Sequence, residues 1–143
     1  MIEIATCSYG EYRPEMGMPV RTSIGAPKWF PHQMMAWDNV FPQYAFLKLE
    51  YDQYLPRYLA KLEQVGVDQL RDDLDFMVST YSQHMPGPAP TTAVLLCYEK
   101  LSKGPDNWCH RTMLADWLTQ HMGATVVELG AKPEPPALGL FDL

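Results

Sequence analysis

The sequence predicts a small α/β domain with three layers, in which helices flank a mostly parallel sheet. Strand-like and helical segments alternate along the chain, and the last three elements read as strand, helix and strand. This order is typical of parallel sheets with right-handed crossovers. The chain has 143 residues, of which 47% are hydrophobic, enough for one core that needs no disulfide or metal to fold. We therefore expect a single α/β domain over residues 1–130 and a tail over residues 131–143.

The first part of the chain contains two short segments that favour strands. β-branched residues alternate with other types over residues 2–7, which predicts a first strand. A second strand is expected over residues 19–23, because the Gly25-Ala26-Pro27 turn signal ends it. The aromatic stretch at residues 28–42 has no clear period. We expect a long loop there, with a short helix near residues 32–37.

The middle of the chain is predicted to be helical. Apolar residues recur every three or four positions over residues 52–65 and again over residues 67–84, which indicates two amphipathic helices. Gly66 separates the two helices, and Asp68 is a plausible N-cap for the second. A shorter helical segment is expected over residues 43–49.

The last third of the domain is predicted to be a strand, a helix and a strand. Residues 92–98 form a nearly continuous apolar run, as in a strand buried on both faces of a parallel sheet. Residues 107–122 are predicted to be a helix that Gly123 ends, and residues 124–129 the last strand. Ligands bind at the carboxyl ends of the strands in such folds, so we expect the functional site at that edge.

Charge and cysteine content limit the class of protein. Eleven Lys and Arg residues against 17 Asp and Glu give a net charge of −6, which argues against a general nucleic-acid binder. No segment looks like a signal peptide, and no apolar run approaches the roughly 20 residues of a membrane span. Cys7, Cys97 and Cys109 have no disulfide-framework spacing, which indicates free thiols in a reducing compartment. We expect a cytoplasmic protein with no membrane contact.

Three adjacent residues at the start of the last predicted helix, Cys109-His110-Arg111, form the main candidate site. A helix N-terminus binds anions, and Arg111 would add a bidentate donor for phosphate or carboxylate. The same position would lower the thiol pKa of Cys109, while His110 could act as a general base. Glu99, just after the buried strand, could accept a proton. We predict Cys109, His110 and Glu99 as catalytic residues and Arg111 as the anion ligand.

Each of these side chains also has a structural interpretation. Cys97 would be a core residue of the strand, and His110 could pack inward against a backbone carbonyl. Arg111 could pair with Glu99 or Asp116. The cysteines and His110 are numerous enough to bind zinc, but their spacing matches no standard zinc motif, so we predict no metal and no other cofactor.

The aromatic stretch supplies further candidate ligand contacts. Trp29 could stack on a nucleobase, and Arg21 and Lys28 could bring positive charge toward a phosphate. The alternative is that the aromatic residues form a small core under a loop and that the cations are ordinary surface charges.

Several of these motifs resemble the family known as domain of unknown function 488, in its branch from bacteriophages and actinobacteria. The similarity lies in Leu96-Cys97-Tyr98-Glu99, in Cys109-His110-Arg111, in Ser8-Tyr9 after the first strand, and in the Pro-aromatic segment at residues 27–30. It covers roughly residues 2–129. The resemblance implies a compact α/β fold whose polar residues cluster, with Ser8 and Tyr9 among the ligand contacts, but it implies no reaction. Many members carry His where Cys7 stands here, so no fixed role follows for Cys7.

The tail carries a possible partner motif. A Pro-rich spacer at residues 132–136 is expected to be extended, and residues 137–141 after it resemble the bacterial sliding-clamp-binding peptide, usually Gln-Leu-x-Leu-Phe. Ala137 replaces the usual Gln. Leu138, Leu140 and Phe141 would fill preformed pockets on the clamp, or they would fold back onto the domain.

Together these features predict a nucleotide- or nucleobase-processing enzyme linked to DNA metabolism, with its anion pocket at the Cys109-His110-Arg111 helix start. The alternative is a non-enzymatic module that senses a nucleotide or docks on a DNA sliding clamp through its tail.

Overall fold

The computed structural model describes residues 2–98 and 109–130, and in it five strands form one all-parallel sheet. The strands are β1 (Glu3–Ser8), β2 (Met18–Arg21), β3 (Met35–Ala36), β4 (Thr92–Cys97) and β5 (Val126–Glu128). Their order across the sheet is β3-β2-β4-β1-β5. The predicted α/β class is therefore confirmed, and the four predicted strands are present with their ends shifted by one or two residues.

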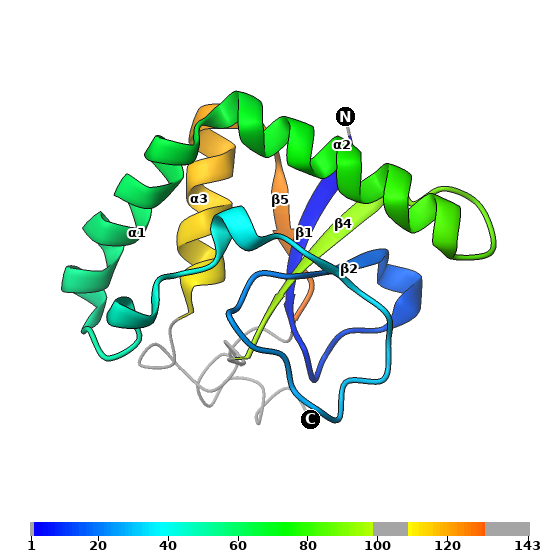
Figure 1. The fold of residues 1–143 in the computed structure, drawn as a ribbon, viewed down its shortest axis with the longest axis horizontal. Coiled ribbons are helices and arrows are strands. Elements are labelled where there is room, and N and C mark those ends of the chain that lie inside the picture. Colours follow the sequence, from blue (N-terminus) through cyan, green and yellow to red (C-terminus); the bar gives the residue numbers. More distant parts are fainter. Residues whose placement is uncertain (1, 99–108, 131–143) are drawn as a thin grey trace, which may run out of the picture.

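Three α-helices pack with this sheet: α1 (Tyr51–Val65), α2 (Val67–His84) and α3 (His110–Met122). In Figure 1 the strands run downward, α2 crosses above their amino ends, and α3 begins near their lower ends and runs back up. Gly66 has a φ of 87° between α1 and α2, a backbone conformation that favours glycine. Gly66 is also the N-cap of α2, so the prediction of Asp68 as N-cap is wrong.

The two faces of the sheet are covered differently. Ile4 and Leu95 belong to the hydrophobic cluster that contains the buried residues of all three α-helices. Cys7 and Leu96 belong to a second cluster, built with Tyr9, Tyr12 and loop residues. Since side chains alternate between faces along a strand, Cys97 lies on the α-helical face and Cys7 on the opposite face.

Residues 32–37 do not form the predicted helix. They contain β3, which pairs with β2 in the register Val20 to Met35, and Trp37 N–H donates to the carbonyl of Arg21. Residues 43–49 hold a single 3-10 turn, η3 (Tyr44–Phe46), rather than a longer helix, and two further 3-10 turns are η1 (Pro14–Met16) and η2 (Asp38–Val40). These residues form hydrogen bonds with other elements of the fold, and their sequence lacks the period of apolar residues that an amphipathic helix requires.

Hydrogen bonds hold the stretch after β3 on α1 and α2, among them one from Lys61 to the carbonyl of Phe41. The indole Nε1 of Trp37 and the amide of Asn39 donate to the carboxylate of Asp73 on α2, at 3.0 and 2.7 Å. The buried hydroxyl of Tyr58 on α1 donates to the carbonyl of Val40 at 2.6 Å. In the described residues no helix is long and apolar enough to cross a membrane.

Candidate functional site

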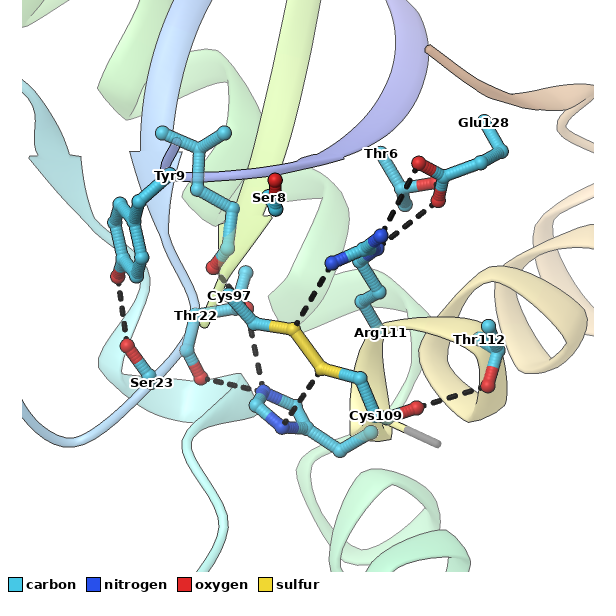
Figure 2. The surroundings of a disulfide bond; sticks show 12 residues. Thr6, Ser8, Tyr9, Thr22, Ser23, Cys97, Cys109, Arg111, Thr112 and Glu128 are labelled. Carbon is cyan, nitrogen blue, oxygen red and sulfur yellow. Dashed lines mark hydrogen bonds and ion pairs between the residues drawn. A yellow bond between two sulfur atoms is a disulfide. The ribbon is translucent and has the colours of Figure 1, made fainter. Parts of the chain in front are cut away.

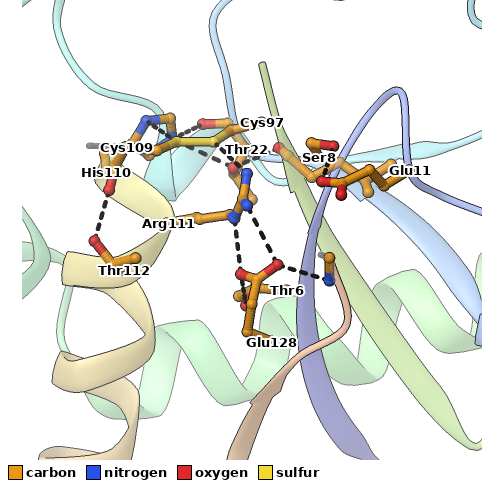
Figure 3. Close-up of polar contacts among 12 residues, drawn as sticks. Thr6, Ser8, Glu11, Thr22, Cys97, Cys109, His110, Arg111, Thr112 and Glu128 are labelled. Atoms are coloured by element: carbon orange, nitrogen blue, oxygen red, sulfur yellow. Dashed lines mark hydrogen bonds and ion pairs between the residues drawn. A yellow bond between two sulfur atoms is a disulfide. The ribbon is translucent and has the colours of Figure 1, made fainter. Parts of the chain in front are cut away.

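Polar side chains gather at the carboxyl edge of the sheet, where the sequence predicts the site. Ser8, Cys97 and Glu128 are the last residues of β1, β4 and β5, and Thr22 directly follows β2. The helix α3 begins beside them with Cys109-His110-Arg111 (Figures 2 and 3). The predicted convergence of distant segments on one edge is therefore present.

A disulfide joins Cys97, at the end of β4, to Cys109, the N-cap residue of α3 (Figure 2). Their Cα atoms are 7.2 Å apart, and both residues are buried. The expectation of free thiols is therefore wrong for this pair. The crossover from β4 to α3 brings together two cysteines that the sequence separates by twelve positions.

The third cysteine, Cys7, is a free, buried thiol on the opposite face of the sheet. Burial, with a smaller contribution from the nearby carboxylates of Glu128 and Glu11, raises its pKa to about 11. The thiol is therefore protonated near neutral pH, which makes Cys7 a poor nucleophile.

His110 is buried and oriented by the end of β2. Its Nε2 lies 2.9 Å from the carbonyl oxygen of Thr22, and its Nδ1 lies 3.9 Å from the Sγ of Cys109. Burial lowers the pKa of His110 to about 4, so the imidazole is neutral at pH 7. Because a carbonyl only accepts, Nε2 carries the proton and Nδ1 presents its lone pair toward the sulfur atoms.

We expect the stability of the disulfide-bonded protein to fall between about pH 6.5 and 4 because of His110. In that range the unfolded imidazole, with its ordinary pKa of 6.5, binds a proton that the folded one does not. Beyond burial, the charges of Arg111 and Lys61 also lower the pKa, while the Thr22 carbonyl opposes them. At 1.36 kcal/mol for each pKa unit, the loss is about 3 kcal/mol.

Urea unfolding of the wild-type protein and of His110→Gln at pH 7, 5.5 and 4 checks this expectation. The difference in unfolding free energy between the two proteins should change with pH, because only the wild type has the buried imidazole. The carboxylates are common to both proteins, so their contributions cancel in the difference. A difference that is constant from pH 7 to pH 4 would contradict the buried neutral imidazole.

Arg111 is fully buried and forms a bidentate ion pair with Glu128 (Figure 3). Its Nε and Nη2 lie 2.9 and 3.2 Å from the two carboxylate oxygens, and its Nη1 lies 3.5 Å from the Sγ of Cys97. Glu128 also accepts hydrogen bonds from the hydroxyl of Thr6 and the backbone N–H of Gly130, both at 2.8 Å. An anion at this guanidinium would therefore have to displace Glu128.

Some of the other predicted ligand residues lie at the carboxyl edge of the sheet, and others lie on the protein surface. Ser8 donates to Glu11 at 2.6 Å, and the buried Tyr9 hydroxyl lies 2.6 Å from the hydroxyl of Ser23. The guanidinium of Arg21 donates to backbone carbonyls after β2 and lies 4.7 Å from the centre of the Phe41 ring. Both Lys28 and Trp29 are exposed. The predicted catalytic residue Glu99 and the tail residues Leu138, Leu140 and Phe141 lie outside the described residues.

A cavity of about 220 Å³ opens beside the disulfide. Its lining comes from the loop after β2, the segment before α1, the end of β4 and the start of α3: Ser23, Ile24, Gly25, Pro42, Leu47, Cys97, Tyr98 and His110. A larger cavity of about 440 Å³ lies at the amino ends of β1 and β5, with a mostly aliphatic lining. We favour the smaller cavity as the site because a sulfur atom and an imidazole line it.

Three possible ligand atoms lie close together beside this cavity. The Sγ atoms of Cys97 and Cys109 and a ring nitrogen of His110 lie within 4.8 Å of one another, and all three residues are buried. The sequence did not indicate the roles of Thr22, which orients His110, and of Glu128, which pairs with Arg111. The position of Glu128 at the end of the last strand was the available signal, because the ends of parallel strands meet at one edge.

No family model matches the chain, and no curated protein or solved structure is significantly similar to it. Membership of the domain of unknown function 488 family therefore stays a prediction from motifs.

Proposed function

We propose that the chain is a small enzyme that processes a nucleobase or nucleotide in the cavity beside Cys97, Cys109 and His110. One observation carries the proposal: buried sulfur atoms and a neutral imidazole meet at a cavity on the carboxyl edge of a parallel sheet. Ligands bind at this edge in parallel α/β folds, and thiols and imidazoles are common catalytic groups.

The cavity favours the base rather than the phosphate as the recognised part. Its volume of about 220 Å³ is below the roughly 300–1,000 Å³ of pockets for drug-sized ligands, and suits a single ring system. Tyr98, which is half exposed, lies edge-on to Tyr9 with ring centres 5.1 Å apart and offers an aromatic wall. The guanidinium of Arg111 is already engaged by Glu128, so we do not assign it to a phosphate of the ligand.

The roles predicted from the sequence fit the reduced form of the site. A dithiol converts the disulfide to two thiols and becomes a disulfide itself. The thiol of Cys109 would then donate a hydrogen bond to Nδ1 of His110, which lies 3.9 Å away in the oxidised form. Glu99 remains a proposed proton acceptor on sequence grounds alone.

Turnover assays on the reduced protein test this function. We would incubate it with a panel of nucleobases, nucleosides and nucleotides, follow products by chromatography, and measure the shift in melting temperature. We expect product from at least one base, and a loss of at least 100-fold in rate for Cys109→Ser. The matched control is Cys7→Ala, which changes the thiol on the opposite face and should keep the wild-type rate.

The two remaining outcomes also decide between hypotheses. A shift in melting temperature without product would support the alternative, a non-enzymatic nucleotide sensor. Neither product nor shift would contradict both. A cytoplasmic location, a link to DNA metabolism and docking of Leu138, Leu140 and Phe141 on a sliding clamp remain proposals that rest on the sequence alone.

A further inference from the structure

We propose that Cys97, Cys109 and His110 bind a zinc ion when the two thiols are reduced. The three ligand atoms already lie within 4.8 Å of one another at the junction of β4 and α3. Tetrahedral zinc with Zn–S bonds of about 2.3 Å places two sulfur atoms about 3.8 Å apart. The two thiolates and one imidazole therefore need only small movements to surround a single ion.

The backbone at this junction leaves room for the ion. The Cα atoms of Cys97 and Cys109 are 7.2 Å apart, whereas most disulfides join Cα atoms that are roughly 4.4–6.8 Å apart. Once the disulfide is reduced, the sulfur atoms are free to separate without bringing β4 and α3 closer. Soft thiolate and imidazole ligands both suit zinc.

A hydrogen bond already orients His110 as a metal ligand. Its Nε2–H donates to the carbonyl of Thr22 at 2.9 Å, which directs the Nδ1 lone pair toward the sulfur atoms. Metal-binding histidines commonly donate their second ring N–H to a carbonyl or carboxylate in this way. The hydroxyl of Thr22 donates to the Leu96 carbonyl of β4, which fixes Thr22 relative to the neighbouring strand.

The charges around the site also favour a bound dication. Two thiolates and Zn²⁺ together are neutral, so the complex avoids the cost of an unpaired buried charge. The guanidinium of Arg111, 3.5 Å from the Sγ of Cys97, can donate a hydrogen bond to the thiolate. Its own charge is balanced by Glu128.

The ion would have an open position toward the cavity. Three protein ligands with a fourth position for water is the pattern of catalytic zinc, which lowers the pKa of bound water toward about 7. Both Cys97 and His110 line the cavity. This step rests on the proposed function: it makes Cys109 a metal ligand rather than a nucleophile, and the ion would supply an activated water to a base bound in the cavity.

Zinc can bind only after the disulfide is reduced. A dithiol transfers two electrons and two protons to the disulfide, which becomes two thiols while the reagent becomes a disulfide. Zinc then displaces the two thiol protons, which are released to solvent. Metal binding should therefore be blocked by oxidation and should weaken at low pH.

Titration of the full chain with metal alone tests the inference. The reduced, chelator-treated protein is titrated with Zn²⁺, and separately with Co²⁺, whose thiolate complexes absorb in the near ultraviolet. We expect one equivalent of metal per chain, sulfur-to-cobalt absorption, and no tight binding by the oxidised protein. We also expect Cys97→Ser to lower affinity at least 100-fold and Cys7→Ala to bind like the wild type.

The outcomes separate this inference from the proposed function. Absence of stoichiometric binding by the reduced protein, or unchanged affinity in folded Cys97→Ser, would overturn the zinc site. Should Cys97→Ser not fold, absence of sulfur-to-cobalt absorption in the wild type would decide against it. Turnover that persists after metal removal would support the proposed function without a role for zinc. Metal binding without turnover would support the zinc site and contradict the proposed function.

Discussion

Replacing Glu128 with alanine is expected to lower the free energy of unfolding by about 3 kcal/mol, because it leaves Arg111 buried without its counter-charge. Removing one partner of a buried ion pair costs roughly 3–5 kcal/mol. We place the effect at the lower end because the side chain of Glu128 is 19% exposed, whereas that of Arg111 is completely buried. The hydroxyl of Thr6 and the N–H of Gly130 would also lose their acceptor.

A double variant that lacks both charges separates the cost of an unpaired Arg111 from the worth of the pair. The variant Arg111→Met with Glu128→Gln removes both charges at similar volume, and such replacements of buried pairs are often close to neutral. We expect the double variant to be more stable than Glu128→Ala in urea unfolding at pH 7. A loss below about 1 kcal/mol for Glu128→Ala would mean that the pair contributes no more than a surface salt bridge.

Truncation of Trp37 to alanine is expected to cost about 3–5 kcal/mol, which is usual for a large aromatic residue in a core. The side chain is 1% exposed and packs in the same hydrophobic cluster as α1 and α2. Its indole N–H is also one of the two donors to Asp73, so the variant keeps only the hydrogen bond of Asn39 between this segment and α2.

The matched control is Trp29→Ala, in the same aromatic stretch. Trp29 is 64% exposed, so its removal should change the free energy of unfolding by no more than about 0.5 kcal/mol. Chemical denaturation followed by far-ultraviolet circular dichroism measures both variants. Equal losses for the two tryptophans would contradict the division of this stretch into a buried part and a surface part.

The elements with strong local patterns were predictable from the sequence. Apolar residues at helical spacing located α1 and α2, and a continuous apolar run located β4. The short strand β3 has only two residues, which is too few for a local period to reveal it, and its pairing with β2 is a tertiary contact across a loop. A buried tryptophan and an exposed one, Trp37 and Trp29, looked alike in the sequence because burial depends on tertiary contacts.

The candidate site was predictable as a place but not as a set of contacts. The rule that parallel strands share a carboxyl edge located Cys109-His110-Arg111 and Cys97 there. Arg111 was expected to pair with Glu99 or Asp116. Glu99 lies outside the described residues, and the sequence did not indicate the pairing with Glu128, which the sheet order brings alongside. The disulfide was missed because the distance between β4 and the start of α3 depends on the crossover geometry.

The sheet order has a consequence for synthesis of the chain. The two neighbours of β1 are β4 and β5, and both are encoded after residue 91. On the ribosome, β1 therefore emerges with no strand to pair with for several seconds, at about 5–20 residues per second. During that time its apolar residues and free backbone groups are available to chaperones or to other nascent chains. The sheet closes only when β4 inserts between β1 and β2, so these two early strands join one sheet late in synthesis, and α3 and β5 are added after that.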